Sequence, residues 1–142
     1  MILFRWIPEY EIHFEKVDNQ HKSLVGMIND LYAAKLEGDT ETAIAQTLDK
    51  LLRYVDAHFF DEEAAMQEWE YPGLKEHRRQ HEELERDVLE LRKRHLNGRG
   101  VATFELLNFL SEWFKVHIVE SDKQFGLFVE AQQKSNLISV QN

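Results

Sequence analysis

The sequence predicts an all-α protein, an up-down-up-down antiparallel four-helix bundle with an N-terminal arm and a short C-terminal extension. The 142 residues include only six glycines and two prolines, and most of these fall near positions 38, 72–73 and 97–100. Glycine and proline end helices and form turns, so they separate four long segments. Each segment carries an apolar stripe in alternating steps of three and four residues, which is typical of packed helices. Short turns between consecutive helices make neighbours antiparallel.

The glycines and prolines, together with the apolar stripes, define the expected helices. The first helix is expected over 18–37 with Asp18 as its N-cap, and the second over 40–66 after Asp39 or Thr40. The third begins after Gly73, and the fourth ends near residue 122. We expect one domain over 1–142, with an arm at 1–17, the bundle at 18–122 and an extension at 123–142. The expected core is Val17, Leu24, Ile28, Leu31, Ile44, Leu48, Leu51, Val55, Ala65, Leu74, Leu84, Val88, Leu91, Leu106, Leu110 and Trp113.

Composition excludes several classes of function. Lys and Arg number 17 against 26 Asp and Glu, a net charge of −9, so we expect no nucleic-acid partner. No apolar run approaches the roughly 20 residues that span a bilayer, and the N-terminus lacks the apolar region of a signal peptide, so we expect a soluble cytoplasmic protein without a membrane partner. Cysteine is absent, which excludes disulfides, iron–sulfur clusters and thiolate metal sites. A metal would therefore be bound by nitrogen and oxygen ligands.

Polar residues interrupt the apolar stripe of every expected helix. Burying one polar group without a partner costs about 1–3 kcal/mol, and burying a charge costs more. His58 and Glu62 are four residues apart, as are His77 and His81, so each pair presents two side chains from one helix face. A lone buried histidine is usually a satisfied core residue, but paired donors on facing helices indicate a metal site.

Three further side chains join these pairs. His21 lies near the start of the first helix and His117 near the end of the fourth, so antiparallel packing gathers all the donors at one end of the bundle. Asp122 follows His117 by five residues, about 140° around an ideal α-helix. These two can share a centre only if the helix ends or takes a π-type turn between residues 119 and 122. His13 and His95 lie at other depths, and we expect them to be structural.

Other chemical motifs do not fit. Arg78 stands where an H-E-x-x-H zinc protease carries its catalytic glutamate. No stripe glutamate lies three residues before a stripe histidine, as carboxylate-rich di-iron bundles require. The sequence contains neither a glycine-rich phosphate loop nor a G-x-S-x-G motif.

Several motifs follow one another between Trp6 and Asp122: Val17-Asp18-Asn19-Gln20-His21, His58-Phe59-Phe60-Asp61-Glu62-Glu63, Tyr71-Pro72, His77-x3-His81 and Trp113-Phe114-Lys115-Val116-His117-Ile118. With these motifs the sequence resembles the single-domain bacterial members of the hemerythrin family. The resemblance implies a non-haem di-iron centre, two iron ions bridged by Glu62, Asp122 and an oxo or hydroxo group. It further implies that one iron is held by three histidines and the other by two, with an open position for dioxygen on the second. By position, the three-histidine set is His77, His81 and His117, and the two-histidine set is His21 and His58.

The resemblance favours reversible dioxygen binding, for carriage or storage, and a protein that is not an enzyme. A dry pocket would protect the centre, and five apolar side chains within one turn of the donors are expected to line it: Leu24, Phe59, Trp113, Phe114 and Ile118. Two alternatives stay open. An oxidase, peroxidase or nitric-oxide-handling activity would need substrate access and a proton donor. Oxygen or redox sensing would need the extension or the arm to dock to a protein partner, which the sequence does not identify.

Overall fold

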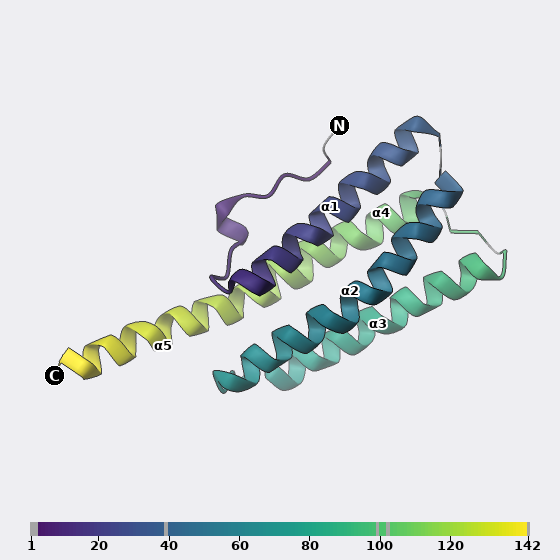
Figure 1. The fold of residues 1–142 in the computed structure, drawn as a ribbon. Helices are drawn as coiled ribbons and strands as arrows, with labels where there is room; N and C mark the ends of the chain where they lie inside the picture. Colours follow the sequence, from purple (N-terminus) through teal and green to yellow (C-terminus); the bar gives the residue numbers. More distant parts are fainter. Residues whose placement is uncertain (1–2, 39, 99, 102, 142) are drawn as a thin grey trace.

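The computed structural model describes residues 3–38, 40–98, 100–101 and 103–141 and confirms the four-helix bundle (Figure 1). Helix α1 contacts α2 and α4, α2 contacts α3, and α3 contacts the segment that follows α4, so the helices close a ring. None of the described helices is long and apolar enough to cross a membrane. The elements are η1 (Pro8–Tyr10), α1 (Glu15–Glu37), α2 (Thr40–Glu68), α3 (Leu74–Leu96), α4 (Thr103–Glu112), the π-helical segment η2 (Trp113–Asp122) and α5 (Lys123–Gln141).

The start of α1 differs from the expected one. The helix begins at Glu15, so the prediction that Asp18 caps it is wrong, and the N-cap residue Phe14 forms no side-chain cap. Asp18 lies in the first turn, and its two carboxylate oxygens accept hydrogen bonds from the N–H groups of Ile12 (2.9 Å) and His13 (3.1 Å). The carboxylate therefore ties the arm to α1, because the arm's last N–H groups have no helical partner of their own.

Helix α2 begins at Thr40, as expected, and the other cap candidate, Asp39, lies outside the described residues. The apolar stripes of the four helices meet in one core that runs from the far end of the bundle to the level of the histidines. Of the residues expected in the core, Ala65, Leu74 and Leu84 are only partly buried. Each fully buried Leu or Ile stabilises the fold by about 1.5–3 kcal/mol, so these stripes account for the bundle.

A second, smaller apolar cluster closes the end at which the histidines lie. The arm and α5 meet there. A Cβ on Gly126 would lie only 2.9 Å from Ile12 Cβ, so glycine permits the close approach. The ammonium of Lys123 donates a hydrogen bond to the carbonyl oxygen of Glu11 at 2.9 Å. The buried members of this cluster are Ile12, Val17, Met66, Phe125 and Val129.

The C-terminal extension is a continuation of the fourth helix rather than a separate element. Helix α5 follows η2 without a break and projects past the end of the bundle (Figure 1). Its first two turns contribute Phe125 and Val129 to the second cluster, whereas residues 130–137 are exposed. The fourth helix therefore links the histidine end of the bundle to a projecting helical end.

Candidate metal centre

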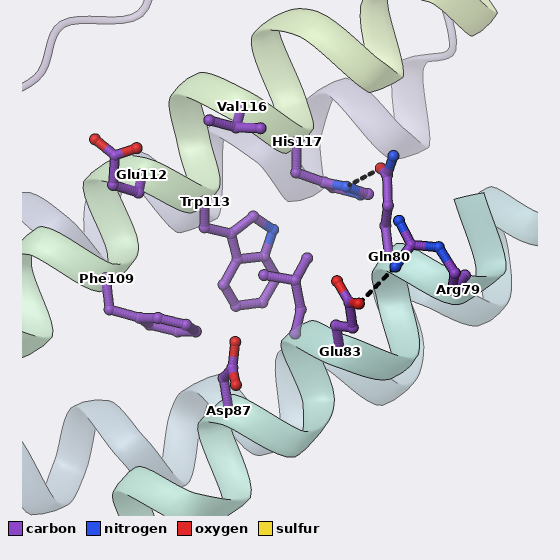
Figure 2. A pocket seen from close by; sticks show the side chains of 10 residues that line it. Arg79, Gln80, Glu83, Asp87, Phe109, Glu112, Trp113, Val116 and His117 are labelled. Atoms are coloured by element: carbon purple, nitrogen blue, oxygen red, sulfur yellow. Dashed lines mark hydrogen bonds and ion pairs between the residues drawn. The ribbon is translucent and has the colours of Figure 1, made fainter. Parts of the chain in front are cut away.

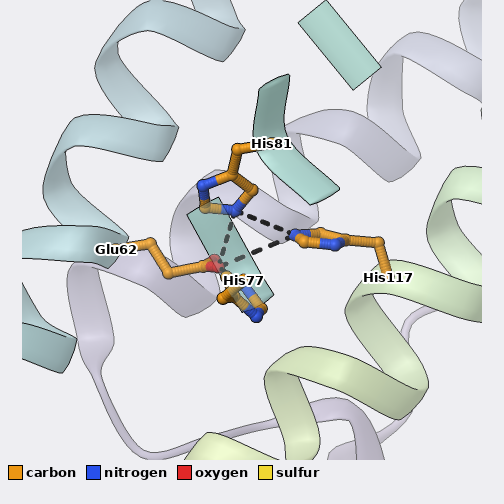
Figure 3. A group of neighbouring side chains, drawn as sticks. All are labelled: Glu62, His77, His81 and His117. Carbon is orange, nitrogen blue, oxygen red and sulfur yellow. Dashed lines mark hydrogen bonds and ion pairs between the residues drawn. The ribbon is translucent and has the colours of Figure 1, made fainter. Parts of the chain in front are cut away.

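All seven side chains expected at the metal centre are buried at one end of the bundle. They form two groups that could hold a metal ion, and within each group the potential ligand atoms lie within 4.8 Å of one another. Glu62 belongs to both groups. His13 and His95 belong to neither group. The first group is Glu62, His77, His81 and His117 (Figure 3), and the second is His21, His58, Glu62 and Asp122.

A π-helix brings His117 and Asp122, which are five residues apart in the sequence, to the same centre. Residues 113–122 form η2, in which hydrogen bonds join residues five apart rather than four. This repeat turns Asp122 back toward the face that carries His117, and the two side chains lie 3.3 Å apart from Nε2 to Oδ1. The π-type geometry is as expected, although it extends over a longer segment than residues 119–122.

Glu62 divides its two carboxylate oxygens between the two sets of histidines. Its Oε1 lies 3.1 Å from His81 Nε2 and 3.7 Å from His117 Nε2. Its Oε2 lies 3.0 Å from His58 Nε2 and 3.5 Å from His21 Nε2. The glutamate therefore stands between the sets, with one oxygen for each.

Asp122 shows the same division. Its Oδ1 lies 2.7 Å from His77 Nε2 and 3.3 Å from His117 Nε2, while its Oδ2 lies 2.9 Å from His21 Nε2. His77 also contacts Oε1 of Glu62. Two carboxylates thus lie between a set of three imidazoles and a set of two, which is the geometry needed to bridge two cations.

Outer contacts orient three of the five imidazoles. In each case Nδ1 faces a side-chain oxygen, so a hydrogen on Nδ1 leaves the Nε2 lone pair directed at the centre. The amide of Gln20 has a defined orientation, because its Nε2 donates to Asp61 at 2.7 Å. The three contacts are His58 with Gln20 Oε1 (2.8 Å), His81 with Glu63 Oε2 (2.8 Å) and His117 with Gln80 Oε1 (3.1 Å).

In the absence of metal the cluster binds protons instead. Burial lowers the pKa of His21, but the carboxylates of Asp122 and Glu62 outweigh it and raise this pKa to about 9. Burial likewise lowers the pKa of His77, but Asp122 and Glu62 outweigh it and raise this pKa to about 10. Burial raises the pKa of Glu62, yet the surrounding imidazoles hold it well below its ordinary value. A metal ion must therefore displace protons from this site.

The donor atoms of the cluster are arranged to bind a cation rather than to form hydrogen bonds with one another. Several donor atoms are buried without a hydrogen-bond partner among the described residues: both ring nitrogens of His21, Nε2 of His58, Oε2 of Glu62 and both oxygens of Asp122. His21 Nε2 and Asp122 Oδ2 are only 2.9 Å apart, but not in hydrogen-bond geometry. Buried polar atoms are rarely left unpaired. Five imidazoles with two carboxylates suit iron, whereas magnesium and calcium prefer oxygen ligands.

The residues expected to line a ligand pocket are all buried in the large core. Phe59 stacks on the His81 ring, with centroids 3.8 Å apart. Phe114 is covered from outside by the arm, through Phe4 at 5.6 Å and Tyr10 at 5.1 Å between ring centroids. The remaining three are Leu24, Trp113 and Ile118, each 2% exposed or less.

Sequence reasoning missed a polar side chain next to this cluster, Tyr54. Its ring stacks on the imidazole of His58 at 5.0 Å between centroids, and its hydroxyl is buried without a hydrogen-bond partner among the described residues. Burial, together with the negative charges of Glu62 and Asp122, raises the pKa of this phenol. The signal was present in the spacing, since Tyr54 precedes His58 by four residues and so shares its helix face.

A surface pocket of about 400 Å³ lies between α3 and the fourth helix (Figure 2). Trp113 and His117 form part of its wall, and Gln80 contacts His117 Nδ1 there. The Nε2 atom on the other side of the same ring lies 3.0 Å from His81 Nε2. The pocket therefore reaches the outer edge of an imidazole, and that ring stands between the pocket and the cluster.

Comparison with known proteins places this fold and site in a family. The family model described as the hemerythrin HHE cation binding domain matches residues 13–126. The chain belongs to the hemerythrin family, a family of oxygen-binding and generally non-enzymatic proteins.

Its relatives include bacterial and animal members. The chain is 36% identical to the bacteriohemerythrin of Pseudomonas aeruginosa over 117 residues, which cover 82% of this chain and 75% of that protein. It is 31% identical to the bacteriohemerythrin of Stenotrophomonas maltophilia over 131 residues, 92% of this chain and 84% of that protein. The crystal structure of a wild-type hemerythrin superposes with a TM-score of 0.78 at 30% identity, covering 87% of this chain and 95% of that one.

Proposed function

We propose that this protein binds dioxygen reversibly at a di-iron centre, for oxygen carriage or storage. His77, His81 and His117 would hold one iron, His21 and His58 the other, and Glu62 and Asp122 would bridge them. The ferrous ions would supply the two electrons that dioxygen accepts on binding and returns on release. The protein's own side chains orient the donors and keep water away from them.

The observation that carries this proposal is the unequal division of histidines around the two carboxylates. One side offers three imidazoles and the other two, while each carboxylate directs one oxygen to either side. The two-histidine side is one donor short, so it supports an open position for a small ligand. The apolar side chains of Leu24 and Ile118, both 0% exposed and each within one helical turn of a histidine of the cluster, support a dry environment around the donors.

The deciding experiment is a visible absorption spectrum of the ferrous protein, with the iron content measured, before air, after air and again under argon. We expect two iron ions per chain and an absorption band that appears with oxygen and fades under argon. A rapid and irreversible change in air would contradict reversible binding and favour a redox enzyme or sensor. A chain that takes up no iron would contradict the metal site itself.

Oxygen or redox sensing is the second candidate, and the continuous fourth helix favours it. His117 and Asp122 lie in η2, and α5 extends from that segment to an exposed end at residues 130–137. A shift at the metal end would thus reach a surface on which a partner could dock. Truncation after Val129, which keeps Phe125 and Val129 in the second apolar cluster and removes the exposed end, separates the candidates: loss of partner binding with intact oxygen binding favours sensing.

A further inference from the structure

Tyr54 lies at the same level of the bundle as the expected pocket. Helices α2 and α4 run toward the metal end, whereas α1 runs away from it. Tyr54 lies four residues before His58, Trp113 lies four before His117, and Leu24 lies three after His21. Each offset is about one helical turn toward the interior of the bundle. The phenol is therefore part of the wall expected around the ligand, next to the two-histidine side.

The phenol places a hydroxyl group in that mainly apolar wall. Its ring packs on His58 at 5.0 Å and on Trp113 at 6.3 Å between centroids. Its hydroxyl is enclosed without a partner among the described residues. A buried hydroxyl without a partner is unfavourable, so its persistence calls for a group that accepts its hydrogen bond.

Trp113 Nε1 is a second buried donor in this wall, and it too has no partner in the part of the chain that the structure describes. Its ring, however, packs against Phe59 at 5.7 Å, and Phe59 stacks on His81 at 3.8 Å and also lies 5.7 Å from His58, so the indole is one ring removed from both sets of histidines. Tyr54 instead contacts a histidine of the two-histidine set, on the side that is one donor short. Of the two donors, the phenol is thus the one associated with the open position.

We propose that the Tyr54 hydroxyl donates a hydrogen bond to the small ligand held on the two-histidine side, an inference that rests on the proposed function. The Tyr54 hydroxyl is then the donor directed at the ligand in a wall of mainly apolar side chains. Such a donor favours ligands that carry or acquire negative charge, such as dioxygen on reduction or an anion of similar size, over neutral ligands.

The test is Tyr54→Phe, which removes only the hydroxyl, with Tyr32→Phe as the matched control. Tyr32 is a partly buried tyrosine that packs against the same core. The probe is azide, titrated into the iron-loaded ferric protein. A hydrogen bond to a charged acceptor contributes about tenfold or more in affinity. We expect azide to bind about tenfold more weakly to Tyr54→Phe and with unchanged affinity to Tyr32→Phe.

Two further readouts separate a ligand contact from a structural role. In the infrared spectrum, the azide stretch of the wild-type protein should shift between H2O and D2O, and this shift should vanish in Tyr54→Phe. The thermal midpoint of metal-free Tyr54→Phe should equal or exceed the wild-type value, because the lost hydroxyl has no hydrogen-bond partner among the described residues.

Unchanged azide affinity in Tyr54→Phe would overturn the inference and leave the proposed function standing. A wild-type azide stretch insensitive to D2O would overturn it as well, even if the variant failed to fold. Wild-type protein that binds iron but no azide or oxygen would overturn both proposals.

Discussion

The two ends of the bundle are stabilised in different ways. At the far end, the core consists of apolar side chains such as Leu31, Ile44, Leu48, Leu91 and Leu106. Their burial is favourable by itself, because it removes apolar surface from water. At the other end, five histidines and two carboxylates are buried, and their burial is unfavourable unless each is compensated by a neighbour, a proton or a cation.

The difference explains why the metal end is covered by additional chain. The arm and the first turns of α5 form the second apolar cluster over that end, and hydrogen bonds from the arm to Asp18 and from Lys123 to the arm fasten it. A low dielectric strengthens the interactions among the buried charges. The polar end therefore depends on both its internal charge balance and its cover, whereas the far end depends on packing alone.

Removing the shared carboxylate should have the largest effect. Glu62→Gln leaves the protonated imidazoles of His21 and His77 with Asp122 as their remaining buried counter-charge. We expect a loss of about 3–5 kcal/mol in the free energy of unfolding of the metal-free protein, and an iron content well below that of the wild type. Urea unfolding and iron analysis test this, with the exposed Glu68→Gln as control. Full iron content at wild-type stability would contradict a shared role for Glu62.

The stability of the metal-free protein should depend on pH mainly through the buried groups of the metal end. The pKa values of His21 (about 9) and His77 (about 10) lie above the ordinary 6.5, so their stabilising contribution is complete below pH 6.5. It is lost as the pH rises through 9 and 10, an effect on the order of a few kcal/mol. The lowered pKa values of Glu62 and Asp122 act oppositely: their contribution is present above about pH 4 and is lost on acidification.

Thermal unfolding of the metal-free protein between pH 4 and 10.5 measures this profile. We expect a maximum between the two limbs and a shallower alkaline limb in Glu62→Gln. An unfolding midpoint that stays constant from pH 7 to pH 10 would show that His21 and His77 are not protonated in the folded state.

A cavity at the far end should weaken the fold without affecting the metal. Leu48→Ala removes a side chain that is 1% exposed and is expected to cost about 2–5 kcal/mol. Iron content per folded chain should remain at the wild-type value, because no donor is displaced. Leu36→Ala is the control, since that side chain is 54% exposed. Loss of iron from folded Leu48→Ala would mean that the two ends are not independent.

The smallest effect on stability is expected from disturbing the contact between the arm and α5 that covers the metal end. Gly126→Ala places a Cβ 2.9 Å from Ile12 Cβ, and the resulting displacement of the arm should cost about 1–3 kcal/mol. Gly26→Ala in α1 is the control, and we expect it to stabilise the protein. A Cβ added there meets nothing within 4 Å, and alanine is favoured over glycine in a helix by about 1 kcal/mol. Urea unfolding measures both. Equal stabilisation by the two substitutions would contradict the close packing of arm and α5.

Sequence periodicity was sufficient for the bundle because each helix carries its own stripe. The positions of His58 and Glu62, or of His77 and His81, follow from spacing alone, and antiparallel packing brings them to one depth. Asp18 was misjudged because a carboxylate at a helix start can cap its own helix or bind the preceding segment, and local sequence does not distinguish these. Tyr54 was overlooked because an aromatic ring on an apolar stripe resembles ordinary core.

The sequence by itself determined the helical stripes, the interrupting donors and their common depth, because these depend on the period of the helix and the order of the chain. Only the tertiary structure decided how Glu62 and Asp122 divide their oxygens, how far η2 extends, and that the Tyr54 hydroxyl is left without a partner. These features depend on distances and directions between side chains of different helices, which packing establishes and no single helix encodes.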